Sequence, residues 1–185
     1  MNLSFHITPQ FWWYVSRASG IVCWVLLTAS LVWGVLLHTR ALRSIDRPGW
    51  LLDMHSWLSG LAILTMVLHC LALVADNYVY FGWSEILLPN ASSWKTGPVS
   101  LGVVSLWLLV LVQGSSLIRR WLSRRIWKFV HVFSYLAWFL VSLHAGLAGT
   151  DVSNRIYQGV ALLATIAAIS ATFLRVATPR RQRTN

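Results

Sequence analysis

Acidic side chains are scarce in this sequence, which has 5 Asp and Glu residues against 15 Lys and Arg residues. Charged residues of both signs make up 11% of the 185 residues, hydrophobic residues make up 57%, and the mean hydropathy is +0.62. Soluble globular domains usually have about 25% charged residues, so this composition excludes that class. The chain is therefore expected to be an integral membrane protein.

Cysteine is equally rare, and glycine forms no motif of a nucleotide-binding site. Cys23 and Cys70 are too few for a disulfide framework or a zinc site. Both fall in apolar stretches, where we expect small packing residues, although a disulfide between them is geometrically conceivable. The chain has no glycine-rich dinucleotide fingerprint, so we expect no nicotinamide- or flavin-binding domain of its own.

Long apolar runs are abundant. A helix needs about 20 apolar residues to cross the bilayer core of about 30 Å. Residues 75–98 form the longest connection and are predicted to lie along the outer interface as a partly helical cap. The predicted fold is all-α: a single domain, residues 1–185, folded as an integral membrane bundle of about five transmembrane helices. The predicted spans are 13–37, 51–74, 98–118, 127–148 and 155–176.

The basic residues cluster at alternate ends of the predicted spans. Twelve lie in 40–47, 119–128 and 175–183, whereas only Arg17, Lys95 and Arg155 fall on the other side. The positive-inside rule then predicts a cell-membrane protein with its N-terminus outside and its C-terminus in the cytoplasm. Because the basic residues flank membrane spans, we expect no nucleic-acid partner.

Two of the spans have a histidine near each end. His69 follows His55 by fourteen positions, and His144 follows His131 by thirteen. At 1.5 Å per residue, the two pairs are separated along their helices by about 21 Å and about 20 Å. Since the second and fourth spans are predicted to be parallel, His55 should lie level with His131, and His69 with His144.

The angular positions of these histidines fit less well. His55 and His69 are about 40° apart around an ideal helix, but His131 and His144 are about 140° apart. We therefore expect either a local distortion of the fourth span or ligands that approach from different flanks.

Facing imidazoles at two depths suit two haems, because a haem iron accepts an imidazole on each axial side and a helix bundle provides an apolar wall. Trp138, near the middle of the fourth span, is a candidate relay or packing residue between them. Intramembrane histidines also relay protons or bind metal ions, so a non-redox transporter or channel is the alternative function. Against this alternative, Asp53 is the one acidic residue that accompanies the histidines in the predicted spans. His6 and His38 are expected to be interfacial or solvated residues.

The His-x13-His and His-x12-His motifs on parallel helices resemble the ferric reductase-like transmembrane domain of ferric reductases, NADPH oxidases and MsrQ-type haem subunits. The resemblance extends from about Arg17 to Arg175. It implies two b-type haems, which have as axial ligands His55, His69, His131 and His144. The segment RASG resembles a family segment with an arginine near the haem, which implies a propionate contact for Arg17. Interfacial snorkelling is the other explanation for this arginine.

The resemblance also implies a direction of electron transfer, from the cytoplasmic His55/His131 pair to the outer His69/His144 pair. Family oxidases have a flavin and nicotinamide domain after the last span, whereas only about nine residues follow it here. We therefore expect the membrane haem subunit of an oxidoreductase, reduced by a separate cytoplasmic flavoprotein or by quinol. The arginine-rich segment 119–128 is a candidate dock for the donor. The expected acceptor is ferric iron, oxygen or an extracytoplasmic redox partner, such as a flavin-binding or methionine sulfoxide reductase protein.

Overall fold

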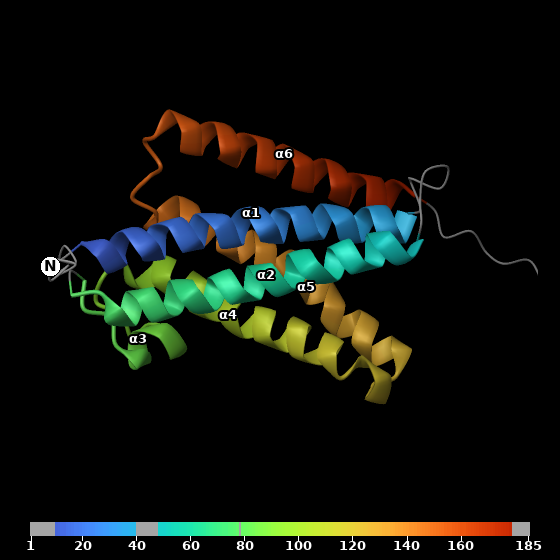
Figure 1. The fold of residues 1–185 in the computed structure, drawn as a ribbon, viewed down its shortest axis with the longest axis horizontal. Coiled ribbons are helices and arrows are strands. Elements are labelled where there is room, and N and C mark those ends of the chain that lie inside the picture. The colour runs from blue at the N-terminus through green and yellow to red at the C-terminus, as the bar shows by residue number, and fades with distance from the viewer. Residues whose placement is uncertain (1–9, 40–47, 78, 179–185) are drawn as a thin grey trace, which may run out of the picture.

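The computed structural model describes residues 10–39, 48–77 and 79–178, and all of its regular structure within these ranges is helical (Figure 1). Five of the helices are long and apolar enough to cross a membrane, which confirms the predicted all-α fold. Their ends differ from the predicted spans by at most three residues. The elements are α1 (Phe11–Thr39), α2 (Pro48–Ala75), α3 (Trp83–Leu87), α4 (Thr96–Leu117), the 3₁₀ turn η1 (Arg119–Trp121), α5 (Arg124–Ala148) and α6 (Arg155–Ala177).

Short polar side chains set the starts of the last two long helices. The Ser123 hydroxyl accepts a hydrogen bond from the Ile126 amide at 3.2 Å and caps α5. The Asn154 side chain accepts from the Ile156 and Tyr157 amides and caps α6. These amides have no partner within the helix, so such caps stabilise helix starts by about 1 kcal/mol each.

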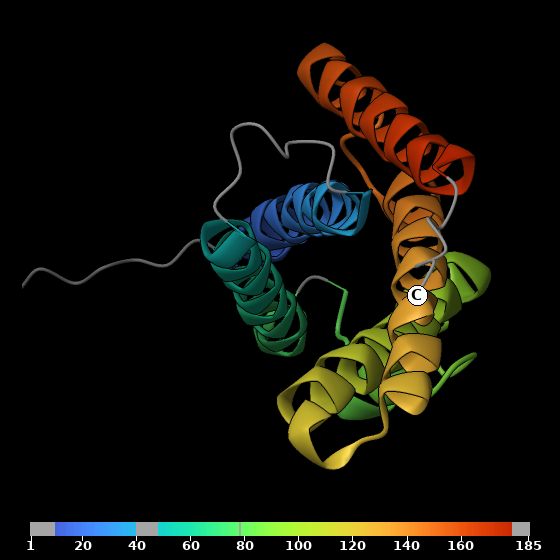
Figure 2. The same cartoon turned by 90° about the vertical axis from the view of Figure 1, so that its right-hand side faces the viewer.

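The long helices form two hairpins and one outlying helix. α1 packs along α2, and α4 packs along α5, whereas α2 meets α4 at few positions. α6 lies against α1, on the side away from α2 (Figures 1 and 2). The two hairpins therefore face each other, and their histidine-bearing helices, α2 and α5, run in the same direction.

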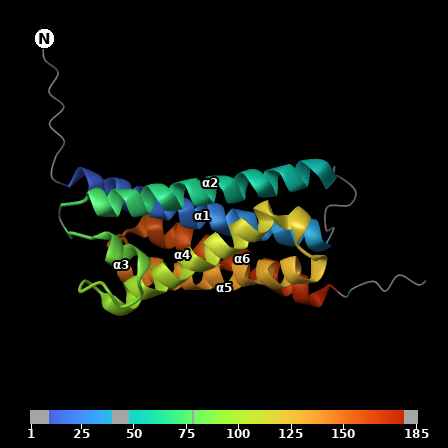
Figure 3. The same ribbon diagram turned by 90° about the horizontal axis from the view of Figure 1, so that it is seen from below.

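One end of the bundle has the predicted cap and the other end has the arginines. α3, in the 75–98 connection, lies at the end where α1 and α4 begin (Figure 3). This confirms that the connection is partly helical. η1 lies at the opposite end, where α4 meets α5. The described basic residues of the η1 end are Arg119, Arg120, Arg124, Arg125, Lys128 and Arg175.

The outer surface of the helices is apolar. On α6, Phe173 is 73% exposed and Val176 is 80% exposed, and large apolar side chains are exposed on the other long helices as well. A soluble monomer rarely exposes so continuous an apolar surface. A lipid bilayer is the environment that would cover it.

An apolar cluster lies between the two hairpins. Its buried members are Cys23 of α1, Met66 of α2, Leu109 of α4 and Ala137 of α5, one from each helix. Interiors are stabilised by such close packing. The cluster occupies the level between the two pairs of histidines.

Candidate functional site: two pairs of facing histidines

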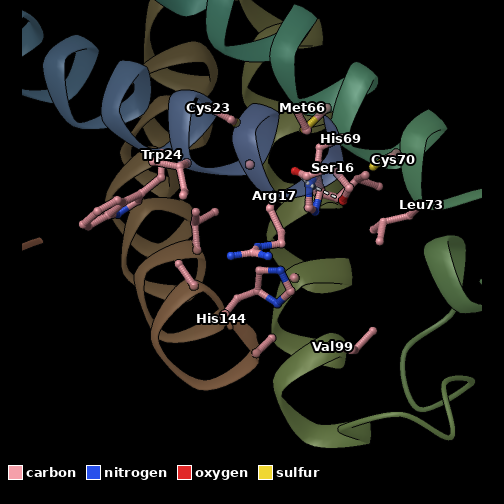
Figure 4. A pocket seen from close by; sticks show the side chains of 18 of the residues that line it. Ser16, Arg17, Cys23, Trp24, Met66, His69, Cys70, Leu73, Val99 and His144 are labelled. Atoms are coloured by element: carbon pink, nitrogen blue, oxygen red, sulfur yellow. Dashed lines mark hydrogen bonds between the residues drawn. The ribbon is translucent and has the colours of Figure 1, made fainter. Parts of the chain in front are cut away.

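The four histidines of α2 and α5 meet in two pairs. The ring centres of His55 and His131 are 6.1 Å apart, and the rings are inclined by 71°. Those of His69 and His144 are 6.4 Å apart and inclined by 80°. These are the pairs that the helical rise predicts, and Figure 4 shows His69 and His144 on separate helices at one cavity. That they are haem ligands stays a prediction.

The angular mismatch on α5 does not come from a break in the helix, since α5 is helical from Arg124 to Ala148. α5 runs at a slant to α2 (Figure 1). Approach of the two haems from different flanks stays a prediction.

Each pair lies in its own cavity. The cavity at His69 and His144 has an empty volume of about 1230 Å³, and the one at His55 and His131 about 2460 Å³, in both cases including space open to the outside. Leu109 of the apolar cluster lines both cavities, so it belongs to the wall between them.

Backbone carbonyls of the neighbouring helices orient three of the rings. His69 Nδ1 lies 2.8 Å from the Ser16 carbonyl oxygen, and His144 Nδ1 lies 2.8 Å from that of Pro98. His55 Nδ1 lies 3.0 Å from the Ser30 carbonyl oxygen. A carbonyl only accepts, so each Nδ1 carries the proton and donates it. In each of these rings Nε2 is left with a lone pair that can bind a metal.

The same three rings lie against glycines, one helical turn after the carbonyls. A Cβ added to Gly20 would be 2.9 Å from His69 Nδ1, and one added to Gly102 would be 2.8 Å from the His144 ring. A Cβ on Gly34 would be 3.2 Å from His55 Cε1. Each of these histidines therefore has a seat, by which we mean a backbone acceptor and, one turn later, a glycine that makes room for the ring.

His131 is supported differently. Its Nδ1 is buried and has no hydrogen-bond partner within residues 10–39, 48–77 and 79–178. Its ring stacks on Trp127, one turn earlier in α5, with ring centres 4.9 Å apart and an interplanar angle of 25°.

The seats were not identified in the sequence, although it contains a signal for them. Ser16 and Gly20 form a Ser-x-x-x-Gly pattern, and Ser30 and Gly34 repeat it fourteen positions later. This interval equals that between His55 and His69. Two helices packed side by side with features at equal intervals bring those features together twice.

Arg17 lies at the His69/His144 cavity, and an acidic residue that the sequence analysis overlooked pairs with it. Its Nε donates to Asp151 at 2.8 Å, and Nη2 makes a second bond to the same carboxylate. Asp151 lies between α5 and α6, and both residues line the cavity. The guanidinium is thus directed by a bidentate ion pair. A propionate contact of Arg17 stays a prediction.

The remaining described candidates lie on α1, α2 and α5, and a relay role of Trp138 stays a prediction. Trp138 lines the His55/His131 cavity and donates to Thr28 Oγ1 at 2.8 Å. Cys23 and Cys70 are free thiols, and Cys23 belongs to the apolar cluster. His38 lies in the last turn of α1. His6 falls outside the described residues.

Fold and site together define a class: a helical bundle fit to span a membrane five times, with two facing histidine pairs in separate cavities. Comparisons with protein-family models, curated proteins and solved structures find no match. The resemblance to the ferric reductase-like domain therefore rests on the sequence pattern.

Proposed function

We propose that this chain is a di-haem b electron-transfer protein of the membrane. His55 and His131 would bind one haem, and His69 and His144 the other, through their Nε2 atoms. The observation that carries the proposal is the presence of two facing imidazole pairs, each at its own cavity between the helices.

The ring spacing supports this proposal. Imidazole binds first-row metals at about 2.0–2.1 Å, so two imidazoles on opposite sides of one metal have ring centres about 6.3 Å apart. The observed separations are 6.1 and 6.4 Å. The described residues contain no group of three or more His, Cys, Asp or Glu that could hold a metal ion. Two axial ligands suffice for haem iron, because the porphyrin provides the other four.

The chain's own residues have defined tasks under this proposal. The Ser16, Ser30 and Pro98 carbonyls hold three imidazoles in the tautomer that leaves Nε2 free to bind. Arg119 and Arg175 line the His55/His131 cavity, where they are suited to a cofactor carboxylate. A haem, when bound with both axial positions filled, takes up and releases one electron at a time.

The proposed path runs from the η1 end to the α3 end. Six described cations gather at the η1 end, which the positive-inside rule assigns to the cytoplasm. A flavoprotein with an acidic surface would dock there, or quinol would deliver electrons from the bilayer. The acceptor at the other end would be ferric iron, oxygen or a redox partner protein.

A proton or ion path has less support in this bundle. The His55/His131 cavity is lined by no acidic side chain among the described residues. The apolar cluster separates it from the other cavity, whereas a proton path needs polar groups or water along its whole length.

The test is the haem content of the purified chain. Two haems per chain are expected, and they should extract into acidified organic solvent, because the sequence has no Cys-x-x-Cys-His attachment motif. His6→Leu, which removes a histidine that precedes α1 in the sequence, is the control and should retain both haems. A folded chain expressed with sufficient haem that contains none would refute the proposal.

A further inference from the structure

The residue intervals of α4 indicate a fourth seat, which would belong to the fourth histidine, His131. Gly34 follows Gly20 by fourteen positions on α1, and Ser116 follows Gly102 by the same interval on α4. The residue fourteen positions after Pro98 is Val112, so the Val112 carbonyl would be the acceptor for the His131 Nδ1–H. The intervals of α4 therefore mark a fourth seat, with serine in the position of glycine.

The carbonyl of this position is already occupied. Val112 O accepts from the Ser115 hydroxyl at 2.8 Å and from the Ser116 hydroxyl at 2.9 Å. A carbonyl oxygen has two lone pairs, and Val112 O also lies within the hydrogen-bonded part of α4. Two hydroxyls thus occupy the acceptor that His131 would use, and the Nδ1 of His131 has no hydrogen-bond partner among the described residues.

Trp127 provides the support that the carbonyl does not. Its indole stacks on the His131 ring, and its Nε1 donates to the Ser116 hydroxyl at 3.5 Å. The Arg119 guanidinium carbon lies 4.3 Å from the centre of the same indole. Ser116 therefore both blocks the carbonyl and anchors the tryptophan.

We infer that Ser116 and Trp127 are positioning residues that hold His131 by ring stacking, and that this makes His131 the weakest of the four haem ligands. An acceptor on Nδ1–H raises the basicity of an imidazole ligand, and its loss typically lowers metal affinity about 10–100-fold. His131 lacks such an acceptor, whereas His55, His69 and His144 each have one. The haem at the His55/His131 pair should then be released first and favour its reduced state more.

This inference rests on the proposed function, and it is tested on the full chain loaded with haem. The measurements are the rate of haem release to excess apomyoglobin and a spectroscopic redox titration. The two haems are told apart with His69→Leu, which keeps the His55/His131 pair intact. In the unaltered chain, we expect the His55/His131 haem to be released at least about ten-fold faster than the other.

Two sets of variants should act in opposite directions. Ser115→Ala with Ser116→Gly frees the Val112 carbonyl and makes a glycine seat, so release of this haem should slow and its midpoint potential should fall. Trp127→Leu should speed its release at least about ten-fold, and Trp127→Phe, which keeps a ring, should restore the slower rate. In all of these variants the His69/His144 haem should be unchanged.

Matched controls lie outside the lining of the His55/His131 cavity. Trp121→Leu removes an indole that an Arg120 guanidinium also covers, at 4.1 Å. Thr172→Gly removes a hydroxyl bonded to its own helix at Ala168. Both should leave release and potential unchanged. Equal release of the two haems, or equal effects of Trp127→Leu and Trp121→Leu, would overturn the inference while leaving the proposed function intact. A chain without haem would instead overturn both.

Discussion

The two ends of the bundle have the same pair of side chains at nearly the same spacing, but their surroundings differ. At the α3 end, both rings have carbonyl and glycine seats, and the cavity has an ion pair beside it. At the η1 end, one ring has a seat and the other rests on an indole, in a larger cavity with cationic walls. Two similar pairs of histidines are thus given unequal surroundings by the residues next to them.

Under the proposed function, the largest expected effect comes from removing a haem ligand. His69→Leu and His144→Leu should each lower the haem content from two per chain to one, and they should leave the same single redox couple. The remaining couple should differ from the one left by His55→Leu or His131→Leu. If His69→Leu instead matched His131→Leu, the pairing seen in the structure would not be the pairing of the haems.

Filling a seat should have a smaller effect, confined to one pair. Gly102→Ala would place a Cβ 2.8 Å from the His144 ring, so the ring must shift and haem affinity at this pair should fall about 10–100-fold. Haem content after dilution measures this. Gly60→Ala is the matched control, since its Cβ would meet nothing within 4 Å. Equal haem loss in both variants would show that the glycine is not part of a seat.

The residues that define the pairs could be predicted, and the residues that support them could not. The histidines fix their own depth, because helical rise alone converts their intervals into levels. The Pro98 carbonyl and the space at Gly102 depend on how α4 packs against α5, which no periodicity within α4 specifies. Asp151 was overlooked because its partner, Arg17, is 134 residues away in the sequence.

The ion pair at the α3 end should contribute modestly. Asp151→Asn removes the charge opposite Arg17, and since the side chains are 29% and 24% exposed, unfolding free energy should fall by no more than about 1 kcal/mol. The spectrum of the His69/His144 haem should shift, and that of the other haem should not. Asp151→Glu, which keeps the charge, is the control. A shift in both spectra would contradict a local role.

The smallest effect should come from acid. Hydrogen bonds, first from the Ser84 hydroxyl, lower the pKa of Glu85, which lines the His69/His144 cavity and caps α3. Because this pKa is lowered in the folded state, the ionised Glu85 stabilises the fold fully above the ordinary glutamate pKa of 4.5. This stabilisation is lost as the pH falls through the lowered pKa. Amide exchange in α3 should rise there, and Glu85→Gln should remove this pH dependence.

The apolar cluster of Cys23, Met66, Leu109 and Ala137 also determines what does not cross the bundle. The cluster places apolar side chains at the level between the two chambers, and water is disfavoured among such side chains. An ion or a proton would have to shed its hydration to pass, at a cost of several kcal/mol. An electron can pass between the haems without water or polar groups along its path. Under the proposed function, the same septum is an insulator for ions, which preserves the membrane potential while charge moves between the haems.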